Sequence, residues 1–286
     1  MSIVLALLAA LFAALTGILA KVGIENVNSN LATAVRTIVV LVMAFIVVIV
    51  TKQLGGIETI TGKAFLFIVL SGFATGISWL FFFKALAIGD VSKVVPIDKS
   101  SVVLTILLSF LVLGEPAAPL VILGGALITI GTFVLIGKND EKKRFTGSQG
   151  FVIYAILGAV FAALTSILAK IGIEEVDSNL ATFIRTIVIL VFAWVIVWFQ
   201  GTFKDLKQIT QKGYLFLILS GVATGLSWLC YFAALAIGKV SIVAPIDKFS
   251  VVLTMVLGII FLKEKVKKET VIGGIIITAG TILLII

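Results

Sequence analysis

"FAALTGILAKVGIE" at residues 12–25 returns almost unchanged as "FAALTSILAKIGIE" at residues 161–174. Adding 149 to any position in 1–137 leads without a gap to its counterpart in 150–286, and roughly half of the positions match. "SGFATGISWL" at 71–80 and "SGVATGLSWL" at 220–229 form a second such pair. We therefore predict two repeats, 1–137 and 150–286, joined by a polar linker at 138–149.

The composition indicates an integral membrane protein, with 61% hydrophobic and 13% charged residues and a mean hydropathy of +1.29. Most of the apolar runs approach the ~20 residues that a helix needs to cross a bilayer. They are continuously apolar, whereas the strands of a membrane barrel alternate. We predict an all-α polytopic membrane protein with ten transmembrane helices, at 3–20, 31–50, 64–83, 102–113, 120–136, 151–169, 180–199, 214–236, 251–262 and 271–286.

Five spans in each repeat are an odd number, so the second repeat enters the membrane from the side opposite to the first. The two repeats are then inverted, which is a recurring ground plan of secondary transporters, with the substrate site near the bilayer midplane. The first apolar run is a retained span rather than a signal peptide, because its partner at 151–169 lies in mid-chain.

Several classes of function are excluded by what the chain lacks. It has no histidine and a single cysteine, Cys230, so we expect no metal site and no intramolecular disulfide. Without a nucleophile–base constellation we expect no enzyme activity. The net charge of +8 fits loops at lipid headgroups, and we expect no nucleic-acid partner, no cofactor, and a monomer or weak homodimer in the bilayer.

"VVPIDKSSVVLT" at 94–105 and "VAPIDKFSVVLT" at 243–254 place a proline, an acid and a base before an apolar run in each repeat. An acidic residue follows that run (Glu115, Glu264), and a glycine-rich helix comes next. With the pair Arg36 and Arg185, these motifs resemble the EamA-type members of the drug/metabolite transporter superfamily. The resemblance spans the whole chain and implies ten helices and movement of small organic solutes, frequently outward, through a central cavity.

The orientation stays open between two expectations. The resemblance implies that both termini lie inside the cell, whereas lysines and arginines gather in the linker and in the loops at 201–213 and 263–270. The positive-inside rule therefore favours a cytoplasmic linker with both termini outside. In either orientation we expect a multi-pass protein of the cell membrane.

Asp98, Lys99, Asp247 and Lys248 are the first candidates for substrate binding or gating. The uncharged segment from Ser100 to Gly114 covers only ~22 Å as a helix, which places the charges at membrane depth or requires a thinner bilayer. Adjacent residues on a helix do not face each other, so Asp98 is expected to meet Lys248, and Asp247 to meet Lys99. The alternative is helix capping by the aspartates and snorkelling by the lysines. A buried aspartate is also a candidate carrier of a coupling proton.

Aromatic and basic residues inside the apolar runs complete the candidate site. Trp79, Trp228 and Tyr231 either line a cavity or belong to an interfacial belt. Arg36 and Arg185 either snorkel to the interface, which we favour, or contact an anionic group. Lys84 corresponds to Ala233 in the other repeat and is expected either to bind a carboxylate of the substrate or to neutralise a nearby Asp98.

The function that these features predict is secondary active transport, with export as the expected direction, of small organic metabolites or drugs by alternating access between the repeats. The alternatives are a flippase or scramblase for a lipid-linked substrate, and a membrane scaffold without transport activity. Substrate and coupling ion are not encoded in any motif of this chain.

Overall fold

A computed structural model describes residues 1–23, 28–88, 94, 97–136, 150–263 and 268–286. Within these residues all regular secondary structure is helical. The expected linker at 138–149, together with Pro96 and Glu264, lies outside the described residues. The helices are α1 (Ser2–Gly23), α2 (Ser29–Val50), η1 (Leu54–Thr59), α3 (Gly62–Ile88), α5 (Ser101–Val112), α6 (Pro119–Ile136), α7 (Gly150–Gly172), α8 (Ser178–Gln200), η2 (Thr202–Gln208), α9 (Gln211–Ile237), α10 (Val240–Asp247), α11 (Ser250–Leu262) and α12 (Lys268–Ile285).

The helices follow the predicted apolar runs, because inside a bilayer only intrahelical bonds satisfy the backbone. Side chains cap several of their first turns: Asn28 accepts from the backbone N–H groups of Asn30 and Leu31 at the start of α2. Asp177 does the same for Asn179 at the start of α8. Eight segments are long and apolar enough to cross a membrane, and Pro119–Leu135 is a shorter apolar helix.

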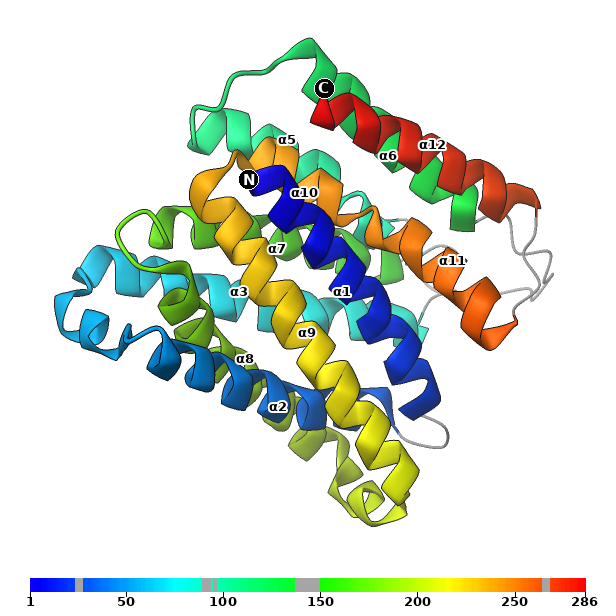
Figure 1. Cartoon of the computed structure of the whole chain (residues 1–286). Helices are drawn as coiled ribbons and strands as arrows, with labels where there is room; N and C mark the ends of the chain where they lie inside the picture. The colour runs from blue at the N-terminus through cyan, green and yellow to red at the C-terminus, as the bar shows by residue number, and fades with distance from the viewer. Residues whose placement is uncertain (24–27, 89–93, 95–96, 137–149, 264–267) are drawn as a thin grey trace.

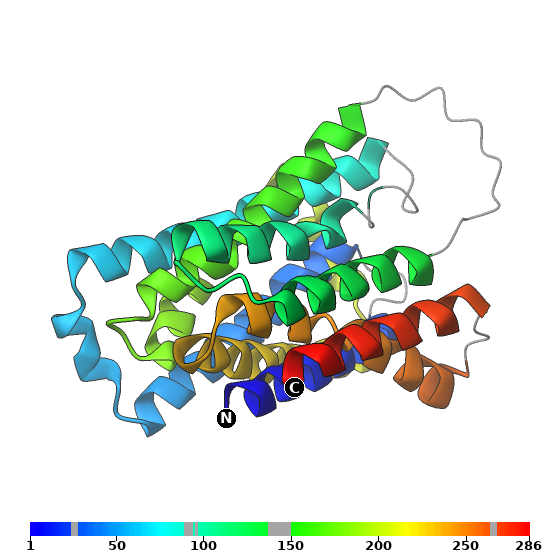
Figure 2. The ribbon, with the colours of Figure 1, turned by 90° about the horizontal axis from the view of Figure 1, so that it is seen from above.

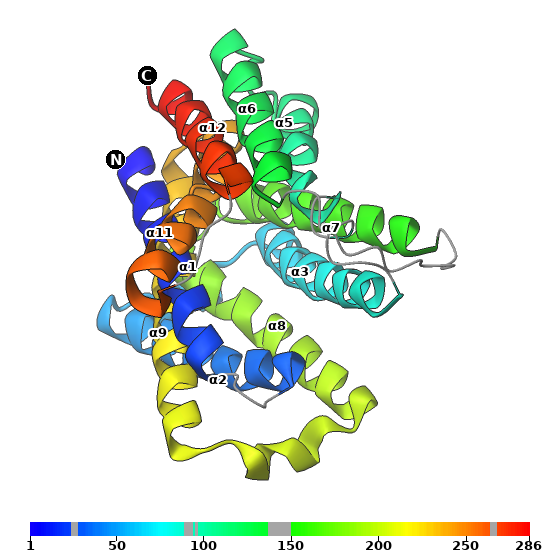
Figure 3. The ribbon, with the colours of Figure 1, turned by 90° about the vertical axis from the view of Figure 1, so that its right-hand side faces the viewer.

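Helices of the first repeat pack on helices of the second. α3 lies against α7, α1 against α9, α2 against α8, and α6 against α12. The pair α6 and α12 forms one edge of the bundle and the pair α2 and α8 the opposite edge (Figure 1, Figure 3). The view from above shows that the chain begins and ends on the same side of the molecule (Figure 2). The core is therefore an interface between the repeats.

Hydrogen bonds between the repeats come in reciprocal pairs. The Ser71 hydroxyl donates to the carbonyl oxygen of Thr165 at 2.7 Å, and the equivalent Ser220 donates to Thr16 at 2.9 Å. The Ser78 hydroxyl donates to the Gly158 carbonyl oxygen and that of Ser227 to Ala9, each at 2.9 Å. Each partner is shifted by 149 residues, which is the pattern of a self-complementary two-fold interface. A pseudo-two-fold axis therefore relates the repeats.

Glycines bring α6 and α12 into close contact. A Cβ atom added at Gly131 would lie 2.8 Å from the Gly273 carbonyl oxygen, and one at Gly280 would lie 2.7 Å from that of Gly124. Small residues of this kind allow membrane helices to approach closely. The Gly72-x-x-x-Gly76 pattern has the same role, since a Cβ at Gly72 would lie 2.9 Å from the Val188 side chain on α8.

Large apolar side chains cover the outside of the bundle. Leu111, Trp198 and Phe199 are 81%, 67% and 77% exposed, values that would be costly in water but suit contact with lipid tails. Smaller residues fill the interior: Ala6, Ala9, Ala14 and Ala163 are all 0% exposed. The chain is an integral multi-pass membrane protein.

Candidate functional site

The second "PIDK" segment lies at a break between two helices. α10 ends at Asp247, and α11 begins at Ser250. Pro245 lacks a backbone N–H. The N–H groups of Lys248 and Phe249 donate to the carbonyl oxygens of Pro245 and Ile246 at 3.0 and 2.9 Å, three residues earlier in the chain. The break falls within the candidate span Val240–Phe261. Broken helices at membrane depth occur where the backbone borders a cavity or other protein.

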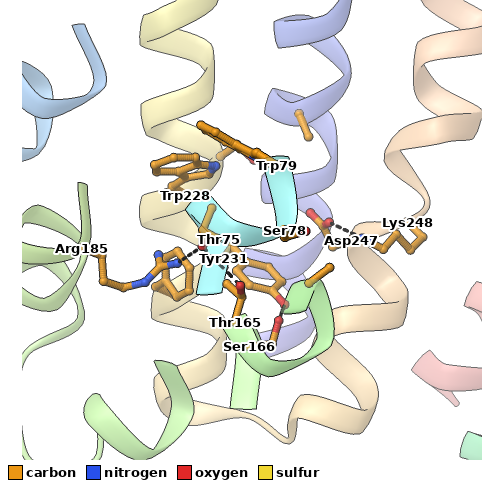
Figure 4. Close-up of a pocket in the computed structure, with 14 residues that line it drawn as sticks. Thr75, Ser78, Trp79, Thr165, Ser166, Arg185, Trp228, Tyr231, Asp247 and Lys248 are labelled. Atoms are coloured by element: carbon orange, nitrogen blue, oxygen red, sulfur yellow. Dashed lines mark hydrogen bonds and ion pairs between the residues drawn. The ribbon is translucent and has the colours of Figure 1, made fainter. Parts of the chain in front are cut away.

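A cavity of about 310 Å³ lies next to this break, and both repeats line it. Its volume is near the lower end of the range for small-molecule sites. Figure 4 shows its residues converging from several helices. The lining combines charged residues, hydroxyl groups, aromatic rings and small apolar groups: Asp247, Lys248 and Arg185; Thr75, Ser78, Thr165, Ser166 and Ser227; Trp79, Trp228, Tyr231 and Phe232; Ala13 and Ala162.

Arg185 on α8 is part of this cavity and does not snorkel to the interface as we favoured. Its side chain is only 2% exposed. Nε donates to the Ser71 hydroxyl at 3.0 Å, and Nη2 donates to the Thr75 hydroxyl at 3.1 Å. The guanidinium carbon lies 3.9 Å from the centroid of the Phe232 ring, a distance at which the cation is attracted to the ring face. These three contacts stabilise the arginine inside the bundle.

Trp79 on α3 and Trp228 on α9 line the cavity together, as one of the two expectations had it (Figure 4). Tyr231 also lines it, and its hydroxyl shares a hydrogen bond of 2.8 Å with the Ser166 hydroxyl on α7. Repeat-related indoles on one side of the cavity provide a flat apolar surface. An aromatic or planar apolar group can stack there.

The ion pairs at the two "PIDK" segments join neighbours in sequence. Lys99 Nζ lies 3.4 Å from Asp98 Oδ2, and Lys248 Nζ lies 3.9 Å from Asp247 Oδ2. Among the described residues no ion pair joins Asp98 to Lys248 or Asp247 to Lys99, so the expected cross-pairs are not formed in this structure. The aspartates are not the N-cap residues of α5 and α11, which are Ser100 and Phe249 and make no side-chain cap bond.

Only one of the two charged pairs borders the cavity. Asp247 and Lys248 are part of its described lining, whereas Asp98 and Lys99 are not. Arg36 is also absent from that lining; its Nη1 donates to the Ser220 hydroxyl at 3.2 Å. Lys84 is exposed and lies outside the lining as well. The two repeats thus contribute unequally to the site.

Glu115 has a structural role that sequence reasoning missed. Its Oε1 and Oε2 accept from the backbone N–H groups of Val240 and Ser241 at 2.6 and 2.9 Å, at the first turn of α10. The Lys170 Nζ donates to the last carbonyl oxygens of α9, among them that of Leu235 at 2.6 Å. Together they hold the turn between α9 and α10. The acidic residue after the fourth apolar run was the available signal, but nothing in the sequence identified its partner.

The helical fold and the cavity between the repeats show which class of protein this is. It is a multi-pass membrane protein whose two similar repeats enclose a polar site. The model of the EamA-like transporter family matches residues 1–137 and 150–286. The chain belongs to this family and is a membrane transporter by that membership.

Two relatives agree with this assignment, and a solved structure has a similar fold. An uncharacterized transporter of Archaeoglobus fulgidus is 21% identical over 286 residues, 100% of this chain and 98% of the relative. An uncharacterized transporter of a Sinorhizobium species is 44% identical over 137 residues, 48% of this chain and 97% of the relative. A crystal structure that is 15% identical has a similar fold, with a TM-score of 0.82 over 99% of this chain and 96% of that chain.

Proposed function

We propose that this protein is a secondary active transporter that carries a small organic solute through the cavity by alternating access between two inverted five-helix repeats. The observation that carries the proposal is the polar cavity between the repeats, next to the break between α10 and α11. Interrupted helices at the repeat interface form the substrate sites of several transporter folds. The two termini on one side of the molecule fit an even number of crossings (Figure 1).

Reciprocal packing supports the alternating mechanism. The bonds of Ser71 and Ser220 are equivalent under the pseudo-two-fold axis. The two repeats can therefore exchange their roles at the interface, which gives two arrangements of similar energy that the axis relates. In one arrangement the cavity opens to one face of the membrane, and in the other to the opposite face. The repeats then rock as rigid bodies around a fixed site.

Asp247 is our candidate for the carrier of a coupling proton, since it is the carboxylate in the described lining of the cavity. Lys248 is its ion-pair partner, and Lys99, Arg185 and Tyr231 are the other ionisable groups near it. An imposed pH gradient is then expected to change the transport rate. A rate that is independent of the gradient would remove proton coupling but leave transport intact.

The test is uptake by purified protein in liposomes, measured with a panel of radiolabelled small organic solutes. We expect saturable, gradient-dependent movement of at least one solute and none in protein-free liposomes. In parallel, a fluorescent lipid in the same liposomes tests the flippase alternative. Translocation of the lipid without solute uptake would overturn the proposal in favour of a flippase or scramblase, and movement of neither would favour a scaffold.

A further inference from the structure

Arg185 is a cation without a counterion in the part of the chain that the structure describes. Among the residues that the structure describes, no carboxylate forms an ion pair with it, and its partners are the neutral hydroxyls of Ser71 and Thr75. The other cation of the described lining, Lys248, already has Asp247 at 3.9 Å. Buried charges are normally paired, because an isolated charge is poorly solvated by protein. The described lining thus carries one positive charge in excess.

One nitrogen of this guanidinium is also unused. Nη1 is buried and has no hydrogen-bond partner among the described residues, whereas Nε donates to Ser71 and Nη2 donates to Thr75. Figure 4 shows the side chain reaching from α8 toward Thr75, Thr165 and Tyr231 in the cavity. A buried donor that lacks an acceptor is costly. The remaining donor has no acceptor among the described residues, and an acceptor on a bound molecule would satisfy it.

The repeat-related arginine supplies an internal comparison. Arg36 donates to Ser220 and to Thr33 on its own helix, and its Nε is likewise buried without a partner among the described residues. It differs from Arg185 in lying outside the described lining of the cavity. Thr224 and Thr75 correspond across the repeat, and each hydroxyl bonds to the backbone one turn earlier, at Ser220 and Ser71. Thr75 also accepts from Arg185, whereas the bonds of Arg36 go to Ser220 and Thr33. Of the two repeat-related arginines, Arg185 alone is part of the described cavity lining.

We propose that Arg185 binds a carboxylate, or a similar planar oxyanion, of the transported substrate, and that an aromatic or planar apolar part of the same molecule lies against Trp79 and Trp228. The guanidinium fork matches a planar oxyanion and remains charged at all physiological pH values. α11 begins just after Lys248, so the positive end of its dipole adds to the attraction. This inference names the substrate class of the proposed transport site and rests on that function.

The test compares the binding of matched acids and amides to the purified, detergent-solubilised protein. The probes are phenylacetate, indole-3-acetate and nicotinate, each paired with its neutral carboxamide, and binding is read as a saturable rise in the unfolding temperature. We expect at least one acid to bind and its amide to bind about 10- to 100-fold more weakly, the loss typical of a charge-assisted hydrogen bond. Arg185→Gln is expected to remove this preference, and Arg36→Gln to retain it.

Three results would overturn the inference: no acid binds better than its amide, Arg185→Gln retains the preference, or Arg36→Gln loses it as completely as Arg185→Gln. If Arg185→Gln does not fold, Arg185→Lys replaces it, because it keeps the charge and loses the fork; unchanged affinity for the acid would then count against the inference. Binding of an acid without its transport in liposomes would contradict the proposed function and leave this anion site standing.

Discussion

At the scale of single residues, the two "PIDK" segments differ in their access to the cavity. Asp247 lines it, and the repeat-related Asp98 does not. We predict that Asp247→Asn lowers the transport rate about tenfold, since it removes a charged hydrogen-bonding group from the site. Asp98→Asn is the matched control, with an expected loss of less than about twofold. Initial rates of solute uptake in liposomes measure both, and equal losses would contradict a one-sided site.

The sequence was sufficient to select many of the residues in the cavity. Asp247, Lys248, Trp79, Trp228 and Tyr231 were identified because charges and aromatic rings inside apolar runs are unusual. The repeat doubled that signal, but it also selected Asp98 and Lys99, which the cavity lining lacks. Residues that are equivalent in sequence therefore differ in their access to the cavity in this structure.

Other parts of the site depend on tertiary contacts that no local pattern encodes. Hydroxyl residues in membrane helices commonly bond to their own backbone, as Thr75 does to the carbonyl oxygen of Ser71. They were therefore not distinguishable as cavity residues. The burial of Arg185 requires Ser71 on α3 and Phe232 on α9, two helices that are far from it in the chain. Snorkelling was the default expectation because those partners were unknown.

At the scale of helices, the direction of α10 depends on Glu115. Removing its carboxylate in Glu115→Ala leaves the N–H groups of Val240 and Ser241 without acceptors, which we expect to lower the free energy of unfolding by about 1–3 kcal/mol. The measurement is the midpoint of thermal unfolding in detergent. Glu58→Ala, at an exposed position, is the control. Unfolding of both variants at the same temperature would exclude Glu115 as a cap.

The crossing of α6 and α12 offers a second test at this scale. Gly131→Ala would place a methyl group 2.8 Å from both the Gly273 carbonyl oxygen and the Ile277 nitrogen. The helices would have to separate, and overpacking of this kind costs about 1–3 kcal/mol. Gly55→Ala, with no atom within 4 Å, should leave the unfolding temperature unchanged. A Gly131→Ala protein as stable as the Gly55→Ala control would show that the contact is unimportant.

Helix positions were predictable because most of the apolar runs have about the length that a bilayer requires. The short run after each "PIDK" segment predicted a short helix, and α11 (Ser250–Leu262) and α5 (Ser101–Val112) have that form. The preceding helix α10 was not predicted, since "SIVAP" contains too few residues for a periodic pattern to be recognised. Its start is defined by Glu115 from the other repeat.

At the scale of the whole molecule, the shift of 149 residues determined the architecture. It predicted two like units. The structure agrees, because the hydrogen bonds of Ser78 and Ser227 are equivalent, and their donors and acceptors differ by the same 149 residues. What the repeat does not predict is the difference between the units at the site, because a pseudo-symmetric sequence carries no information on which partner faces the cavity. Ten crossings, inversion and orientation in the membrane remain parts of the proposal.

The central claim is that one cavity between the repeats opens alternately to both sides of the membrane. Thiol labelling at Ala162, which lines the cavity, tests this claim most directly. Ala162→Cys is made in a Cys230→Ser background, and a membrane-impermeant thiol reagent is added to either face of vesicles of known orientation. Ile156→Cys, on the same helix and 49% exposed on the outside of the bundle, is the control. The account predicts labelling of Ala162→Cys from both faces with loss of transport, and no labelling of the control. Labelling from one face only, or no more than in the control, would contradict it.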